Sequence, residues 1–218
     1  MEIINQIIES RNFLKQNLDN TVNPIDETLP IIPPFRGKDE IKLIILGQDP
    51  TIRNIKSRQN ITCTLNLDKN GSLRNYILSI CAVLDLSIEN VYATNLFKYF
   101  YTYPPANTID VLNEHLSYNL ELLKLELTEF DTIPIITLGE PVFKLLTQKN
   151  AKVREFWDFD NKSHMSNGHF ISSTTNKLDR IIFPFPHQPS LRKTFYKATF
   201  NDYGYFMNNN IKKSHNIT

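Results

Sequence analysis

Four clusters of polar residues in this sequence have the residue types of a chemical site, and each follows an apolar run. The clusters are Gly47-Gln48-Asp49-Pro50, Asn95-Leu96-Phe97-Lys98, Gly139-Glu140-Pro141 and Pro186-His187-Gln188-Pro189-Ser190-Leu191. They contain a carboxylate and an imidazole, which can stabilise charge or move protons, and carboxamides, which can pair with a planar amide edge. They contain no Ser-His-Asp order, no glycine-rich phosphate loop and no ligand set for a metal.

Each cluster also has a purely structural interpretation. Gly-x-Asp-Pro after a strand is often a turn in which the Asp side chain bonds to the backbone. His187 lies among prolines and can be a structural histidine, and Asn95 can cap the next loop. Glu140 can be the partner of a helix dipole. The recurrence of such clusters at four successive apolar runs favours a site.

The apolar runs that precede the clusters predict four strands. The first is short, β-branched and almost continuously apolar, which is typical of a strand buried on both faces. The four predicted strands are Ile41–Leu46, Val91–Leu96, Ile133–Leu138 and Arg180–Phe185.

Helical periodicity and capping residues predict the helices around these strands. We expect a helix over Ile3–Leu18, helices opened by Ser72 and Thr108, a helix that begins at Pro141, and helix in the aromatic remainder of the chain. Strands that alternate with helices predict an α/β, three-layer sandwich in which a central, mainly parallel four-stranded sheet carries helices on both faces.

A single domain over residues 1–218 is expected, because the sequence has no repeat, low-complexity run or convincing linker. Residues 1–40 form an N-terminal helix and a Pro-rich connector in this prediction, and residues from about 205 to 218 form a tail. Ligands of open α/β sheets bind beyond the carboxyl ends of the strands. We therefore expect Gln48, Asp49, Asn95 and His187 to converge on one crevice.

The composition favours a cytoplasmic protein. The two cysteines are too few for a disulfide framework or a four-thiolate metal site, which indicates a reducing compartment and free thiols. No apolar run approaches the roughly 20 residues of a membrane span, and the first residues lack the basic region of a signal peptide. The net charge is +1, yet five Lys or Arg face one acidic residue after His187. That end is either a solvated surface or a nucleic-acid contact.

The polar clusters resemble motifs of the uracil-DNA glycosylase superfamily. Gly-Gln-Asp-Pro after the first strand resembles the water-activating motif of the classical enzymes. His187-Gln188-Pro189-Ser190-Leu191 resembles their His-Pro-Ser-Pro-Leu loop, with Leu four residues after His in both. Asn95 falls where the family carries its base-reading Asn at a strand end. The likeness runs from about Ile41 to about Tyr196, with the motifs in the family's order.

The resemblance implies a DNA glycosylase that flips uracil or a related, C5-modified pyrimidine out of DNA and hydrolyses its N-glycosidic bond in base-excision repair. Asp49 would stabilise the sugar cation and orient water, and His187 would bind the base carbonyl. Gln48, Asn95 and Thr51 would contact the base. The residues expected to contact DNA are Pro50, Ser190, Leu191, Arg192 and Lys193. No metal or cofactor is implied, and the expected partner is single- or double-stranded DNA, bound by a monomer.

The sequence departs from the family in three places. Thr51 stands where the family has an aromatic that blocks the C5 side of the base, so room is expected there unless Tyr99 or Tyr101 fills it. The segment 58–67 lacks the aromatic on which the family stacks the base, for which Phe97 or Tyr99 could substitute. The Ser of the His loop has also moved by one position.

Two alternatives from other classes stay open. One is a catalytically silent, nucleic-acid-binding relative that keeps the fold. The other is a nucleoside or nucleotide hydrolase that uses the same crevice on a small molecule. The basic C-terminal end favours the nucleic-acid functions over the small-molecule one.

Overall fold

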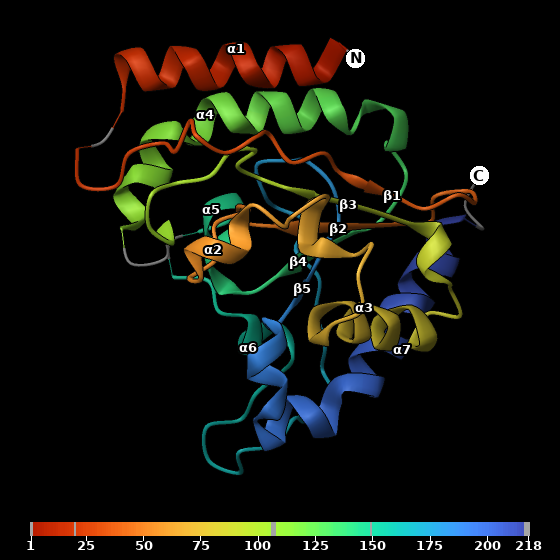
Figure 1. Cartoon of the computed structure of the whole chain (residues 1–218). Helices are drawn as coiled ribbons and strands as arrows, with labels where there is room; N and C mark the ends of the chain where they lie inside the picture. Colours follow the sequence, from red (N-terminus) through yellow and green to blue (C-terminus); the bar gives the residue numbers. More distant parts are fainter. Residues whose placement is uncertain (1, 20, 106–107, 149, 216–218) are drawn as a thin grey trace.

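A mixed five-stranded sheet forms the centre of the computed structural model, which describes residues 2–19, 21–105, 108–148 and 150–215 (Figure 1). Its strands, in spatial order, are β1 (Phe35–Arg36), β3 (Val91–Asn95), β2 (Leu43–Gly47), β4 (Ile135–Leu138) and β5 (Ile182–Phe185). The last four are parallel to one another, whereas β1 is antiparallel to β3. The structure therefore has an α/β fold with a mostly parallel sheet.

The prediction of four strands was wrong because it missed β1. This strand has two residues and lies in the Pro-rich connector, directly after Pro33 and Pro34. Two residues are too few to display the alternation by which a strand is recognised, and the prolines favour an irregular segment. The four predicted strands are all present, with their first residues shifted by up to two positions.

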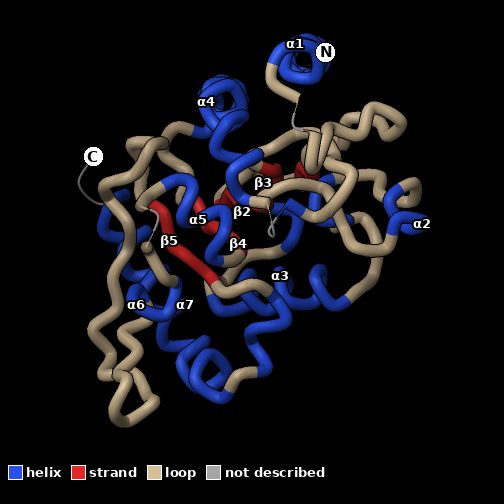
Figure 2. Tube along the Cα trace, turned by 90° about the vertical axis from the view of Figure 1, so that its left-hand side faces the viewer, coloured by secondary structure: helices blue, strands red, loops and turns tan. Residues whose placement is uncertain are grey.

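Seven α-helices surround the sheet in the described part of the chain. They are α1 (Glu2–Asn17), α2 (Ile55–Arg58), α3 (Ser72–Val83), α4 (Ile109–Glu126), α5 (Glu140–Leu146), α6 (Val153–Phe156) and α7 (Thr194–His215). The helix α4, with α1 outside it, lies on one side of the sheet, and α3, α6 and α7 lie on the other (Figures 1 and 2). Helices on both sides explain why all five residues of β2 are buried.

Helix ends differ in detail from the sequence prediction. Ser72 is the first residue of α3 and not its cap, because Gly71 takes the capping position without a side-chain hydrogen bond. Thr108 does precede α4, also without a side-chain cap, and Pro141 lies in the first turn of α5. The helix α7 continues through most of the segment expected as a tail, because Met207 is buried against the core there; the side chains from 212 onward lie outside the described residues.

Cys63 and Cys81 are both buried, and neither forms a disulfide, as expected. Among the described residues, no helix combines the length and apolar character needed to cross a membrane.

Candidate active site at the carboxyl ends of the strands

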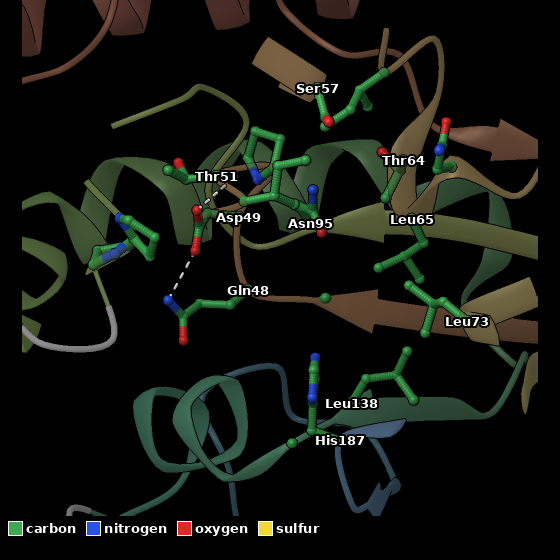
Figure 3. Close-up of a pocket in the computed structure, with 18 of the residues that line it drawn as sticks. Gln48, Asp49, Thr51, Ser57, Thr64, Leu65, Leu73, Asn95, Leu138 and His187 are labelled. Carbon is green, nitrogen blue, oxygen red and sulfur yellow. Dashed lines mark hydrogen bonds between the residues drawn. The ribbon is translucent and has the colours of Figure 1, made fainter. Parts of the chain in front are cut away.

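A cavity of about 610 Å³ opens at the carboxyl ends of the parallel strands (Figure 3). Its walls include Gln48, Asp49, Thr51, Asn95 and His187, which come from segments as far apart in sequence as β2 and the turn after β5. The register of the sheet explains this convergence, because β2 and β3 end level with each other and β4 and β5 do the same. Each strand therefore brings part of its polar cluster to the same cavity.

Asp49 is a half-buried carboxylate held at both oxygens. Its Oδ1 accepts a hydrogen bond from the backbone N–H of Thr51 at 2.7 Å, and its Oδ2 accepts one from Nε2 of Gln48 at 2.8 Å (Figure 3). Burial raises the pKa of Asp49 to about 6, although these hydrogen bonds and the nearby Arg58 oppose the rise. The carboxylate is thus fixed in place, and its ionised form is destabilised relative to a carboxylate in water.

Gln48 contributes to the site mainly through Asp49. Its amide N–H groups were expected to face the ligand, but Nε2 donates to the Asp49 carboxylate. The Gln48 backbone carbonyl also accepts a hydrogen bond from the Phe97 N–H at 2.8 Å, which joins the turn after β2 to the turn after β3. Gln48 therefore positions the carboxylate as well as lining the cavity.

Asn95 presents its carboxamide to the cavity because its neighbour in the sheet is a glycine. Gly47 pairs directly with Asn95, and a Cβ atom at Gly47 would lie 2.3 Å from Oδ1 of Asn95. Any other residue at Gly47 would displace the Asn95 side chain. Asn95 is 3% exposed, and its Oδ1 has no hydrogen-bond partner among the described residues. Such an unpaired buried oxygen is costly unless a ligand pairs with it.

His187 reaches the cavity through a turn that two other elements fix. The hydroxyl of Tyr76, on α3, donates to the Pro186 carbonyl at 2.9 Å. Gly139, with a φ of 97°, approaches so closely that an added Cβ would lie 3.3 Å from Cβ of His187. Partial burial lowers the pKa of His187 from its usual value. This shift favours the neutral imidazole, which can donate one N–H.

Thr51 lines the cavity with its hydroxyl already engaged. Its Oγ1 accepts a hydrogen bond from the backbone N–H of Tyr101 at 2.8 Å. Tyr101 and Tyr99 are almost fully buried, and neither lines the cavity; the residues after β3 that do so are Pro104 and Pro105. Of the two alternatives for the space beside Thr51, filling by Tyr99 or Tyr101 is therefore not what the structure has.

Arg58 anchors the segment that carries Thr51, and sequence reasoning did not identify it. This arginine is 2% exposed, and its guanidinium donates to the carbonyls of Ile52, Tyr101 and Thr102 at 2.9–3.0 Å. It also lies 4.0 Å from a carboxylate oxygen of Asp26. The buried cation thereby ties the turn after β2 to the segment after β3, behind the cavity wall.

Leu65 was also missed, and it supplies an apolar wall where the resemblance led us to look for an aromatic. It lies in the short 3-10 helix η1 (Thr64–Asn66), lines the cavity, and has a Cδ atom 3.0 Å from where a Gly47 Cβ would be. Its φ of 58° is unusual for leucine. Phe97 is fully buried and does not line the cavity. Leucine in this backbone conformation has no sequence signal.

Of the residues expected to contact DNA, one lines the cavity and four lie outside it. Pro50 is buried and lines the cavity, whereas the other four lie beyond it, on or next to the 3-10 helix η5 (Gln188–Arg192). Leu191 is half-buried and packs against the core. Arg192 and Lys193 are exposed.

Glu140 fits its structural interpretation, since it pairs with Lys144 at 3.4 Å and does not line the cavity. Among the described residues, no group of three or more His, Cys, Asp or Glu side chains could hold a metal ion.

Comparison with known proteins gives no family assignment. No protein-family model matches the chain, and no curated protein matches its sequence. The cavity and the groups that line it are therefore the basis for inferring a function.

Proposed function

We propose that the chain is a monofunctional DNA glycosylase of the uracil-DNA glycosylase superfamily, which hydrolyses the N-glycosidic bond of uracil or a related pyrimidine in base-excision repair. The observation that carries the proposal is the unpaired, buried Oδ1 of Asn95, in a side chain that shares one cavity with the half-buried Asp49 carboxylate and the His187 imidazole. Because all three groups come from one chain, we propose a monomer, and we place it in the cytoplasm on the grounds of its free thiols.

The division of roles follows the charge that develops in the reaction. When the bond between C1′ and N1 breaks, its electron pair leaves with the base and the sugar becomes cationic. Water then adds to C1′ and gives up a proton to the Asp49 carboxylate, and the departing base anion takes up a proton from solvent. In this proposal the Asp49 carboxylate stabilises the cation and accepts a hydrogen bond from the attacking water. His187 donates an N–H to a carbonyl of the departing base, where the negative charge collects.

Selectivity in this proposal comes from Asn95. Its amide can accept from N3–H and donate to O4 of uracil, whereas cytosine presents the opposite polarity at this edge and would leave buried groups unpaired. Gly47 makes this possible, because it leaves the space that the Asn95 amide occupies. The cavity also has room for a whole flipped nucleotide base with its sugar, at about 610 Å³.

Incubation of the chain with oligonucleotides that carry one uracil, followed by alkali, tests this function. Strand cleavage at the uracil position is the expected result, with no cleavage at cytosine and none without alkali. Binding without base release would support the catalytically silent relative. Release of bases from free nucleosides or nucleotides, and not from DNA, would support the small-molecule hydrolase.

The rate of base release is expected to rise with pH and to level off above about 6. Asp49 must be ionised to stabilise the sugar cation, and burial raises its pKa to about 6. Below that pH the rate should fall about tenfold per unit, because the ionised fraction falls by that factor. Single-turnover rate constants across the pH range measure this limb. A rate that stays constant down to about pH 4, the usual pKa of Asp, would contradict the role given to Asp49.

A further inference from the structure

Positive charge in this chain is concentrated in two segments. Residues 50–84 contain five Lys or Arg and one acidic residue, and residues 180–201 contain four Lys or Arg and no acidic residue. The whole chain has a net charge of only +1, so the rest of it is net acidic. A segregation of this kind produces a positive potential around whatever the two segments surround.

The two segments surround the mouth of the cavity. Ile52 and Ser57, which flank the exposed residues Arg53 and Lys56, line the cavity on one side. His187 lines the opposite side, with Asp49 between (Figure 3). We call Arg53, Lys56 and Lys69 the α2 wall, since Lys69 also lines the cavity. We call Arg192 and Lys193 the His-loop wall.

Among the described residues, no cation of either wall forms an ion pair: this holds for Arg53, Lys56 and Lys69 and for both residues of the His-loop wall. Some other surface cations do form ion pairs, such as Arg36 with Glu129 at 2.6 Å and Lys124 with Asp179 at 3.6 Å. The cations of the walls are therefore not held by a carboxylate within ion-pair distance.

The cations of the α2 segment serve two different purposes. The guanidinium of Arg58 is buried and used within the fold, whereas its basic neighbours Arg53 and Lys56 are exposed. Ile55, between those two, is 64% exposed and offers an apolar surface to a sugar or base. Exposed cations with an interleaved apolar side chain suit a nucleic-acid backbone.

We propose that the α2 wall is a second surface for the DNA backbone, so that the strand crosses the cavity mouth with one basic wall on each side of the flipped nucleotide. This inference rests on the proposed function and assigns binding residues that the family motifs do not include. Phosphates on one side of the target nucleotide contact the α2 wall, and phosphates on the other side contact the His-loop wall. Each wall then adds affinity without reading sequence.

The test compares three double variants: Arg53→Ala with Lys56→Ala, Arg192→Ala with Lys193→Ala, and the control Lys38→Ala with Lys162→Ala. The control residues are exposed and lie in segments that do not line the cavity. Binding is measured against salt on a single-stranded oligonucleotide whose central 2′-fluoro-deoxyuridine resists hydrolysis. Thermal melting of each variant checks that the fold is kept.

Each wall variant is expected to lower the log–log salt slope by about 1.5, since each removes two phosphate contacts, while the control leaves it unchanged. An oligonucleotide shortened on the side that contacts the α2 wall should bind the α2-wall variant almost as tightly as the full-length oligonucleotide does, because that variant has already lost those contacts. An oligonucleotide shortened on the other side should in the same way bind the His-loop-wall variant with little loss of affinity. An α2-wall variant with wild-type affinity and slope would overturn the inference. Base release by the wild-type chain from a uracil oligonucleotide is recorded in parallel, so that failure of the proposed function is seen separately.

Discussion

Asp49→Asn is expected to lose most of the base-release activity and, at neutral pH, to unfold less readily than the wild type. Stabilisation of the sugar cation and orientation of water both depend on the charge, so the single-turnover rate should fall by about 10²–10⁴-fold. DNA affinity should change little, because the residues proposed to contact phosphates lie on the exposed walls and not at Asp49. Rates and equilibrium binding are measured on the same oligonucleotide.

The gain in stability follows from the raised pKa of Asp49. The unfolded chain ionises this group near pH 3.8, and the folded chain does so only near 6. The contribution of Asp49 to the free energy of unfolding therefore falls between about pH 4 and 6 and stays low above 6. The total is at most about 3 kcal/mol, less whatever solvent access to the half-buried group removes. Asn at this position carries no charge, so the free energy of unfolding of Asp49→Asn should not show this decline with pH.

A matched control separates this effect from a general effect of Asp-to-Asn changes. Asp160 accepts hydrogen bonds from the backbone N–H groups of Lys162 and Ser163, which lower its pKa. Asp160→Asn should therefore keep full activity and bring no gain in stability. If Asp49 were only a turn residue, Asp49→Asn would keep its activity as well, and that outcome would remove the proposed mechanism.

Thr51→Tyr is expected to narrow the range of bases that the site releases. The wild type has a small residue here, and neither Tyr99 nor Tyr101 reaches the cavity to replace an aromatic. A pocket that only tolerates an added group discriminates weakly, by about 1–3 kcal/mol, or roughly 10–200-fold. We therefore expect release of 5-hydroxymethyluracil and of mispaired thymine within that range of uracil. Tyrosine should exclude both by steric clash, a repulsive form of specificity.

Excision of uracil, thymine and 5-hydroxymethyluracil is compared for the wild type, Thr51→Tyr and Thr51→Ser. Serine keeps the hydroxyl that accepts from the Tyr101 N–H and stays small, so this control should release the substituted bases as the wild type does. Equal exclusion of the substituted bases by all three proteins would show that Thr51 does not bound the C5 side of the base.

The four parallel strands, and the residues that follow them, could be predicted from the sequence because they depend on local patterns of apolar residues. The runs at Leu43–Gly47 and Ile182–Phe185 are apolar because helices cover both faces of the sheet. A strand buried on both faces can therefore be predicted from its continuous apolar run. Parallel strands bring their carboxyl ends to one edge, so the meeting of Asp49, Asn95 and His187 on one cavity followed from the order of the elements.

The remaining features depend on contacts between distant segments, which no local pattern encodes. Arg58 reads as one more surface cation, yet it is buried because three backbone carbonyls from two segments surround it. Leu65 is exposed to the cavity only because its backbone adopts a left-handed conformation. Leu191 packs partly on the core, whereas its place after His187 predicted a contact with DNA.

Release of the base by Asp49 chemistry can be followed by mass spectrometry of the free base. The wild-type chain and Asp49→Asn are incubated separately with the same uracil-containing oligonucleotide, and the released base and the remaining strand are quantified. The wild type should give free uracil and an intact strand with one abasic site, in equal amounts, and Asp49→Asn should give at least about 10²-fold less of both. Absence of free uracil with the wild type, or equal release by the two proteins, would contradict the proposed reaction.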